Sequence, residues 1–389
     1  MAQISRQSHH FVQPLGTHEA YILRFALSLA RVGELKHFWV YILWLGAVAF
    51  GQVERGPSVR NAATFPGKDI GAQITAAYSA LPATGGAILV PESASFDTPV
   101  VFGTKDKPVL LMGLPGDIVT LTYTGATGTA LTFDYGTKHR MGHGLRDLTL
   151  TGPGNSTNTS GVIFGGSNGA EGIALRDFKI QSFGTNLQMG SNTWLAYFEH
   201  GMIRDGGRNV LLPSGLTQAG EQIVFNHVTF ADAPPPHTNS VWVQGGGQEV
   251  IFTDCSFDQA QLRIGNNGAT AAQVVVRGGH FENPNYVWPD SVNYDYVITD
   301  IHPGNYLRIV ESYFLQDAPS GGPARFLCLN GGKVNVRDVG MYTPAGSPLG
   351  SFAVLWNAVS VQMEGFNDLS GNITGPLFSG STSGLVVER

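Results

Sequence analysis

Apolar and polar residues alternate along most of the chain after residue 140, but the alternation changes phase every few residues. The recurring unit has eight residues, with apolar residues at its first, third, sixth and eighth positions. Clear copies occupy 173–180, 223–230, 250–257, 307–314 and 334–341, and looser copies begin at His143, Ala196, Val274 and Val361. Each unit predicts two short strands joined by a two-residue turn that reverses the side-chain phase.

The units recur about every 27 residues, and a third short strand precedes several of them, at 241–243, 262–264, 326–328 and 353–356. Three strands per repeat predict a coil that pairs in parallel with the next coil, about 4.8 Å away. No single coil can bury its apolar face, so the stack is the unit of stability. An antiparallel sandwich would need hairpin turns and longer strands. We therefore predict an all-β fold, a right-handed parallel β-helix of about nine or more coils.

The segment before the repeat predicts a short helix that covers the open end of the first coil. Asp69 is a suitable N-cap, because its carboxylate can accept a hydrogen bond from the first helical turn. Apolar residues with helical spacing follow at Ile70, Ile74, Ala77, Tyr78 and Leu81. A strand is expected at 87–90.

The N-terminal segment has the pattern of an export signal. The apolar run 38–51, FWVYILWLGAVAFG, follows Lys36, and its length suits a signal peptide better than a membrane span. Ala47 and Ala49 supply a small-x-small cleavage pattern. The expected division is 1–51 as signal or leader, 52–140 as cap helix and first coils, 141–370 as the β-helix and 371–389 as a C-terminal tail. A retained N-terminal anchor is the alternative to a mature chain without a membrane span, secreted or in the cell envelope.

Composition narrows the possible partners. Only 13% of the residues are charged, the formal net charge is −6 and no basic tract occurs, which argues against nucleic-acid binding. The two cysteines, Cys255 and Cys328, stand at apolar strand positions and are expected to be buried small hydrophobic residues.

The stretch GKDIGAQITAAYSALPATGGAILVP resembles the N-terminal signature of the pectate lyase superfamily, and the coils after Met141 resemble its β-helix repeats. The resemblance covers roughly 65–370. That superfamily includes rhamnogalacturonase- and polygalacturonase-like hydrolases, pectate lyases, epimerases and phage tailspike depolymerases. The resemblance implies a substrate groove along the first strand of each coil, which here precedes each eight-residue unit. It is specific for the fold and says little about chemistry.

Alternation on those first strands selects the candidate groove residues. The side chains expected to face outward include Trp242, Gln244, Arg263, Tyr296, Asp300 and Arg325. The long loop 282–296 adds Tyr286, Trp288 and Tyr294, which together with Tyr296 are candidates for stacking on sugar rings. The alternative is a loop held to the β-helix by buried aromatic side chains.

The candidate chemistry is incomplete. Polygalacturonase-like enzymes carry a set of acidic, histidine and Arg-x-Lys motifs, but Asp300 lacks the preceding Asn, no Asp-Asp pair occurs, and Arg263 lacks the Lys. A lyase needs a base and a group that stabilises negative charge, which Asp300 with Arg263 or Arg325 could supply. Ca²⁺ held by Asp232 or Asp258 is a possible cofactor, although no tight acidic cluster is evident. A solvated strand-end carboxylate is the alternative for Asp300.

The turn inside each unit carries a column of polar residues, at Asp147, Asp177, His200, His227, Asp254, Glu311 and Asp338. Stacked acids and histidines suggest a metal or proton-relay column, with His200 beside His227 as its most interesting pair. The structural interpretation is stronger, since such turns select residues that tolerate left-handed backbone.

Two functions fit these observations. The first is a secreted glycan-degrading enzyme, a lyase or glycoside hydrolase, with a polysaccharide substrate. The second is a non-catalytic β-helix that binds glycan or serves as a structural element of the cell surface.

Overall fold

The structure is a computed structural model of the chain. It describes residues 58–116, 118–137, 143–231, 240–245, 249–266, 268, 270–283, 296–316, 326–343, 352–355, 359–371, 373 and 375–380. The leader expected at 1–51 lies outside these residues, so its cleavage and the export of the chain stay predictions.

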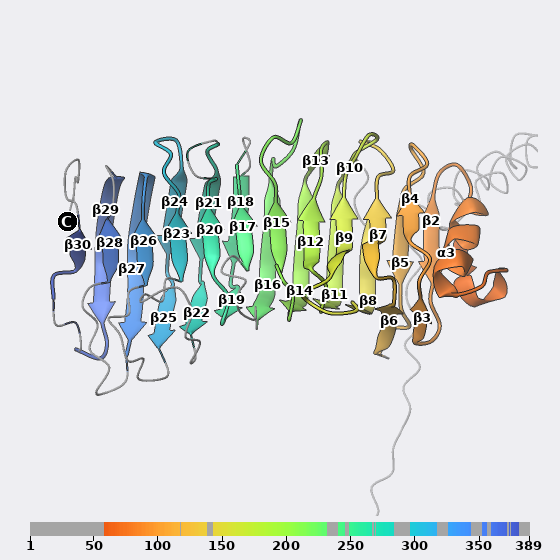
Figure 1. The fold of residues 1–389 in the computed structure, drawn as a ribbon, viewed down its shortest axis with the longest axis horizontal. Coiled ribbons are helices and arrows are strands. Elements are labelled where there is room, and N and C mark those ends of the chain that lie inside the picture. The colour runs from red at the N-terminus through yellow and green to blue at the C-terminus, as the bar shows by residue number, and fades with distance from the viewer. Residues whose placement is uncertain are drawn as a thin grey trace, which may run out of the picture. The chain divides into compact units, whose positions relative to one another are not determined.

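The strands of residues 57–389 wind into a right-handed parallel β-helix, as the sequence predicts, and successive coils lie side by side (Figure 1). Every strand pairing in the described part of the chain is parallel, which excludes the antiparallel sandwich there. The larger sheet, called sheet A, has 17 described strands. They are β1 (Val59–Asn61), β2 (Gly86–Leu89), β3 (Ala94–Phe96), β5 (Val109–Met112), β6 (Val119–Tyr123), β8 (His143–Thr151), β11 (Ile173–Gln181), β14 (Ala196–Arg204), β16 (Ile223–Ala231), β18 (Glu249–Thr253), β19 (Ser256–Asp258), β21 (Gln273–Arg277), β22 (His280–Asn283), β24 (Tyr306–Val310), β25 (Tyr313–Gln316), β27 (Gly332–Tyr342) and β29 (Val359–Asp368).

The smaller sheet, called sheet B, contains the short strand that precedes each eight-residue unit, and it has 11 described strands. They are β4 (Val100–Phe102), β7 (Thr127–Phe133), β9 (Asn158–Phe164), β12 (Thr185–Met189), β15 (Val210–Leu212), β17 (Val241–Val243), β20 (Leu262–Ile264), β23 (Val297–Thr299), β26 (Leu327–Leu329), β28 (Ala353–Leu355) and β30 (Phe378–Gly380). A further pair, β10 (Ala170–Glu171) and β13 (Thr193–Trp194), lies apart from both sheets. Because β30 pairs with β28, the stack includes part of the segment expected as a C-terminal tail.

Each eight-residue unit forms one bent ribbon whose bend is a single residue with left-handed backbone. In β11, Leu175 and Phe178 both point into the core, because Asp177 between them has a φ of 51° and reverses the side-chain phase. All seven residues of the polar column have φ values of 50–53°, and Gly278 and Gly365 continue it with φ of 65°. Since Asp tolerates this conformation and Gly meets no steric penalty there, the structural interpretation of the column is confirmed.

The two histidines of this column lie close together but remain at the surface. The rings of His200 and His227 are 5.6 Å apart between centroids. His200 Nδ1 lies 3.9 Å from Asp177 Oδ1, and His227 Nε2 lies 4.0 Å from Asp254 Oδ2. All four side chains are at least half exposed, so these long contacts add little stability.

Stacked phenylalanines fill the interior of the coils. Residues at the same place in successive units meet face to face, as in Phe198–Phe225 at 4.4 Å between ring centroids and Phe281–Phe314 at 4.6 Å. The sequence repeat therefore becomes a spatial repeat, because each coil places the same position directly over the last. Cys255 and Cys328 are buried free thiols, and burial raises the pKa of the Cys255 thiol to about 12. Their expected role as buried hydrophobic residues is confirmed.

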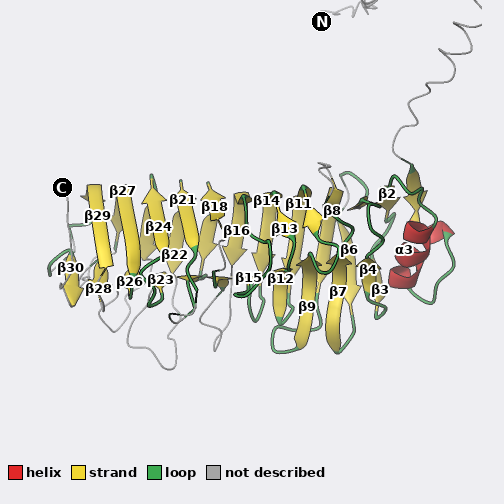
Figure 2. Ribbon diagram, turned by 90° about the horizontal axis from the view of Figure 1, so that it is seen from above, coloured by secondary structure: helices red, strands yellow, loops and turns green. Residues whose placement is uncertain are grey.

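The helix α3 (Ile70–Ser79) covers one end of the stack beside β2, β3 and β4 (Figure 2). A single 3-10 turn, η1 (Ala62–Thr64), precedes it. The predicted apolar stripe is buried, since Ile70, Ile74, Ala77, Tyr78 and Leu81 are each at most 7% exposed. In the described residues, no helix has the length and apolar character that a membrane crossing requires.

Asp69 caps this helix and ties it to the first coil. Its Oδ1 accepts a hydrogen bond from Ala72 N at 2.8 Å, and its Oδ2 accepts from Asp97 N at 3.0 Å, Thr98 N at 3.1 Å and Thr98 Oγ1 at 2.9 Å. Burial alone would raise the pKa of Asp69, but these hydrogen bonds hold its pKa well below the ordinary value of 3.8.

We expect Asp69→Ala to lower the free energy of unfolding by about 1–2 kcal/mol at neutral pH, since it removes a helix cap with further bonds. A folded-state pKa below the unfolded value contributes stability that is present above the unfolded pKa and lost as the pH falls through the folded one. The gap between wild type and variant should therefore shrink below about pH 4. Thermal denaturation at neutral and acidic pH measures this gap. Asp97→Ala, which removes an exposed pair with Lys68 and a long 3.4 Å hydrogen bond from Thr98 Oγ1, is the control and should cost at most about 0.5 kcal/mol.

Candidate functional site

The outer face of sheet B carries two of the predicted groove residues, Trp242 in β17 and Arg263 in β20. In β17, Val241 and Val243 are fully buried, and in β20, Leu262 and Ile264 are fully buried. The residues between them, Trp242 and Arg263, point away from the core and lie directly opposite each other in the parallel register. The expected alternation therefore holds on these two strands.

Trp242 supports two guanidinium groups. The central carbon of the Arg263 guanidinium lies 4.7 Å from the centroid of the Trp242 ring, and that of Arg208 lies 4.9 Å from it. The indole Nε1 donates a hydrogen bond to Gly265 O at 2.8 Å, which fixes the ring. Such cation–π contacts gain strength where water is excluded. The ring thus serves as a platform for two arginines more than as an open surface for a sugar.

Arg263 is held by Asp300 in a buried ion pair. Its Nε donates to both carboxylate oxygens of Asp300, at 3.0 Å each, and its Nη2 lies 2.9 Å from Asp300 Oδ1. The two side chains are 18% and 4% exposed. Asp300 follows β23 on the next coil, and its backbone is fixed by a bond from Asp300 N to Ile264 O at 2.7 Å. The idea of a solvated strand-end carboxylate is therefore wrong.

Arg208 completes this group, which we call the arginine–tryptophan site (Arg208, Trp242, Arg263 and Asp300). Loss of hydration on burial, and secondly repulsion from Arg263, lower the pKa of the Arg208 guanidinium. No described carboxylate pairs with Arg208, so the site contains two guanidinium groups and one carboxylate. Sequence patterns missed Arg208 because it precedes β15 in a turn, where no alternation marks it, and reaches Trp242 on the next coil.

The neighbouring outward positions on sheet B bring no second carboxylate. Leu211 flanks Trp242 on one side, and Ile298 flanks Arg263 on the other. Gln244, a candidate for binding substrate, also joins two neighbouring coils, since its Oε1 accepts a hydrogen bond from Ser214 N at 2.9 Å. Its main-chain carbonyl accepts from Thr270 Oγ1 at 2.6 Å.

Two expectations about side-chain direction are wrong. Tyr296 is 4% exposed and packs in the core, where its ring lies 5.0 Å from Phe326 and its hydroxyl donates to Leu315 O at 2.7 Å. Tyr296 stands directly before β23, and its ring faces inward because it packs against Phe314 and Phe326 there while a carbonyl receives its hydroxyl. In β26, alternation from the outward Arg325 predicts that Phe326 and Cys328 face inward and Leu327 outward. Phe326 is indeed buried, but Leu327 and Leu329 take the inward positions of the strand and Cys328 the outward one.

Other candidates lie outside the described residues. They are Asp232, Tyr286, Trp288, Tyr294 and Arg325. Their roles in binding glycan, in catalysis or in holding Ca²⁺ remain predictions.

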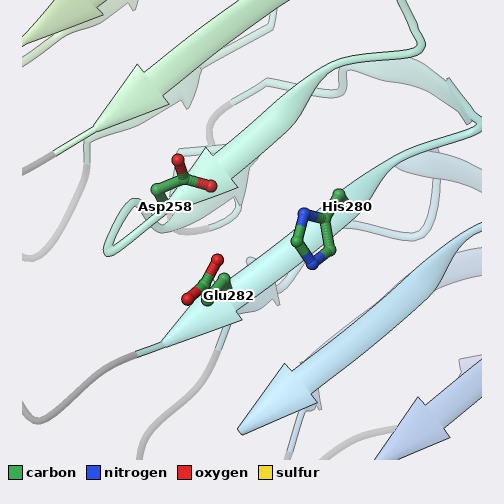
Figure 3. A group of neighbouring side chains, drawn as sticks. All are labelled: Asp258, His280 and Glu282. Carbon is green, nitrogen blue, oxygen red and sulfur yellow. The ribbon is translucent and has the colours of Figure 1, made fainter. Parts of the chain in front are cut away.

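Asp258, the other calcium candidate, lies on the outer side of sheet A near His280 and Glu282 (Figure 3). Calcium takes six to eight oxygen ligands. The described cluster offers two carboxylates and an imidazole, and an imidazole nitrogen suits a transition-metal ion better than calcium.

Comparison with known proteins bears on the fold. No protein-family model matches the chain. An uncharacterized 65.4 kDa protein in the cps region of Klebsiella pneumoniae is 24% identical over 180 residues, which are 45% of this chain and 28% of that protein. The alignment thus spans less than a third of that relative's length.

Two solved structures share the architecture. The enzymatically active domain of bacteriophage CBA120 tailspike protein 4 superposes with a TM-score of 0.61 at 16% identity, over 83% of this chain and 45% of that one. The A-module of the Azotobacter vinelandii mannuronan C-5 epimerase AlgE4 gives 0.55 at 12% identity, over 85% of this chain and 98% of that one. The chain therefore shares the parallel β-helix fold of these two proteins.

Proposed function

We propose that this protein acts on an acidic polysaccharide, which it binds across the outer face of sheet B at the arginine–tryptophan site. The observation that carries the proposal is the pair of guanidinium groups over Trp242, of which Asp300 neutralises one. The whole chain has a formal net charge of −6, yet two guanidinium groups lie together at the arginine–tryptophan site. A guanidinium binds a carboxylate through two parallel hydrogen bonds, which makes a uronate residue the fitting ligand.

Within this site, Arg208 is the group that takes the substrate carboxylate. Arg263 is already bonded three times to Asp300, whereas no described acid engages Arg208. Its partial desolvation means that a carboxylate meets less competition from water there. Trp242 and Asp300 act as positioning residues, because one supports both guanidinium groups and the other fixes Arg263.

Elimination fits this site better than hydrolysis. Hydrolysis of a glycosidic bond uses two carboxyl groups several ångströms apart. Within the arginine–tryptophan site the described carboxylate is that of Asp300, which is buried and bonded to Arg263. A uronate lyase instead needs a base that takes the α-proton and positive charge that stabilises the resulting anion, and of these two the arginines of the site supply the charge. A mannuronan C-5 epimerase has the same fold, so this scaffold can hold a site for uronate chemistry. This support comes from the fold alone.

Non-catalytic glycan binding is the second candidate. It is favoured by the engagement of Asp300 with Arg263, because both oxygens of that carboxylate accept hydrogen bonds from the guanidinium instead of facing a substrate. Either activity fits a protein that works outside the cytoplasm, and we propose a secreted or cell-envelope location on the basis of the leader pattern at 1–51.

The test compares binding to acidic and neutral polysaccharides by affinity electrophoresis or calorimetry. Loss of one hydrogen-bonded charge costs about 1.5–3 kcal/mol, so Arg208→Ala should weaken binding to polyuronates about ten- to hundredfold. Trp242→Ala should weaken it similarly, because both guanidinium groups lose their support. Arg277→Ala removes an exposed arginine on sheet A and should leave binding unchanged.

A screen for unsaturated uronate ends and for new reducing ends separates the two candidates. Unsaturated ends support a lyase, and reducing ends alone support a hydrolase. Tight binding with no product of either kind supports the non-catalytic protein. Equal binding of neutral and acidic glycans, or equal loss in Arg208→Ala and Arg277→Ala, contradicts the proposed site.

A further inference from the structure

Two neighbouring strands of sheet A bring a histidine and two carboxylates together on their outward side (Figure 3). From this geometry we propose that Asp258, His280 and Glu282 form a binding site for a divalent transition-metal ion, with Zn²⁺ as its representative. One ligand atom from each residue lies within 4.8 Å of the other two. The arginine–tryptophan site shares none of these residues, so this proposal does not depend on the proposed function.

The backbone fixes the three side chains on one face. In the parallel register of β19 and β22, Asp258 lies beside Glu282, and Ser256 lies beside His280. Between them, Phe257 and Phe281 point into the core, where their rings stack at 4.6 Å. Because side chains alternate along a strand, the residues on either side of these two phenylalanines must face outward. The ligand set therefore stands on rigid, well-packed strands.

The two carboxylates are direct neighbours in the register of β19 and β22. Like charges in directly neighbouring cross-strand positions are destabilising. A cation bound between the two carboxylates would remove this repulsion, so the pair favours cation binding.

His280 is well placed to be a ligand. Neither of its ring nitrogens makes a hydrogen bond with a described side chain or main-chain group, and its ring lies 5.8 Å from that of Tyr313. The imidazole therefore keeps a lone pair for a metal. Ser256 donates a hydrogen bond through its hydroxyl to Asp258 Oδ1, which orients that carboxylate as an outer partner of a metal ligand does.

The ligand types select the ion. One imidazole nitrogen and two carboxylate oxygens suit Zn²⁺, whereas Ca²⁺ prefers six to eight oxygens. Ligand atoms around a tetrahedral Zn²⁺ are roughly 3.4 Å apart, given bonds of about 2.1 Å. The ligand atoms of the three residues are up to 4.8 Å apart, and small rotations of the Asp258 and Glu282 side chains would shorten these distances to the required value. All three residues are half-buried, so water can fill the remaining coordination position.

The test titrates the chelator-stripped full chain with ZnCl₂, MnCl₂ and CaCl₂ separately by calorimetry, and records the visible spectrum after addition of CoCl₂. We expect about one Zn²⁺ per chain, bound at least about tenfold more tightly than Ca²⁺. His280→Gln and Glu282→Gln should each weaken Zn²⁺ binding at least about tenfold and reduce the Co²⁺ absorption. His227→Gln is the matched control, because it removes a histidine from another strand of sheet A that also lies near a carboxylate.

Circular dichroism melts establish that each variant is folded, and Glu282→Gln near the end of β22 carries the test if His280→Gln does not fold. The proposal is overturned if the wild type binds no Zn²⁺ or binds Ca²⁺ more tightly. It is equally overturned if His280→Gln and Glu282→Gln keep wild-type affinity, or if His227→Gln loses as much.

Discussion

Asp300→Ala should lower the free energy of unfolding by about 3–5 kcal/mol, because it leaves the guanidinium of Arg263 largely buried without its carboxylate. The guanidinium makes three close contacts with Asp300, and that side chain is 4% exposed, so little water can replace it. Guanidinium chloride denaturation, followed by circular dichroism, measures the loss. This prediction separates a structural ion pair from a catalytic base, which would lose activity without such a loss of stability.

A double variant sharpens this test. Arg263→Met combined with Asp300→Leu removes both charges and should recover much of the stability that Asp300→Ala loses, since apolar groups of similar volume replace the pair. Arg277→Ala, an exposed arginine on β21, should change stability by no more than about 0.5 kcal/mol. An Asp300→Ala variant as stable as the wild type would show that the pair contributes nothing to the fold.

Phe225→Ala should cost about 3–5 kcal/mol, because it removes a ring from the middle of the phenylalanine stack. Phe225 is fully buried and lies 4.4 Å from Phe198 and 5.1 Å from Phe252 between ring centroids. Its removal leaves a cavity that neighbouring coils cannot close, since their strands are held in register on both sides. The measurement is again the denaturation midpoint.

Hydrogen exchange adds a spatial readout to the same variant. Because each coil contacts only its neighbours, amide protection should fall most in β14, β16 and β18 and least in α3. Val101→Ala, at a position 52% exposed on sheet B, is the control and should change stability by no more than about 0.5 kcal/mol. A uniform loss of protection along the whole β-helix would contradict a stack stabilised coil by coil.

The candidate site could be predicted only in part. Alternation found Trp242 and Arg263, because both lie inside strands with clear apolar neighbours. Alternation also found Asp300, but it did not predict the buried ion pair of Asp300 with Arg263, because that pair joins two adjacent coils. Arg208 has no periodic signal, and the metal-type cluster combines residues more than 20 positions apart in sequence. Tyr296 and the phase of β26 were predicted wrongly because a turn next to a strand can direct a side chain either way.

The sequence by itself determined the coil, because apolar positions at fixed spacing in a 27-residue repeat can be buried together only by stacking. It also determined the capping helix, through Asp69 and the apolar stripe after it, and the left-handed corners, through the residue types that tolerate them. The tertiary structure decided which polar side chains meet. Those contacts join neighbouring coils, and their partners are set by the register of parallel strands and by the turns between sheets, which local sequence patterns do not encode.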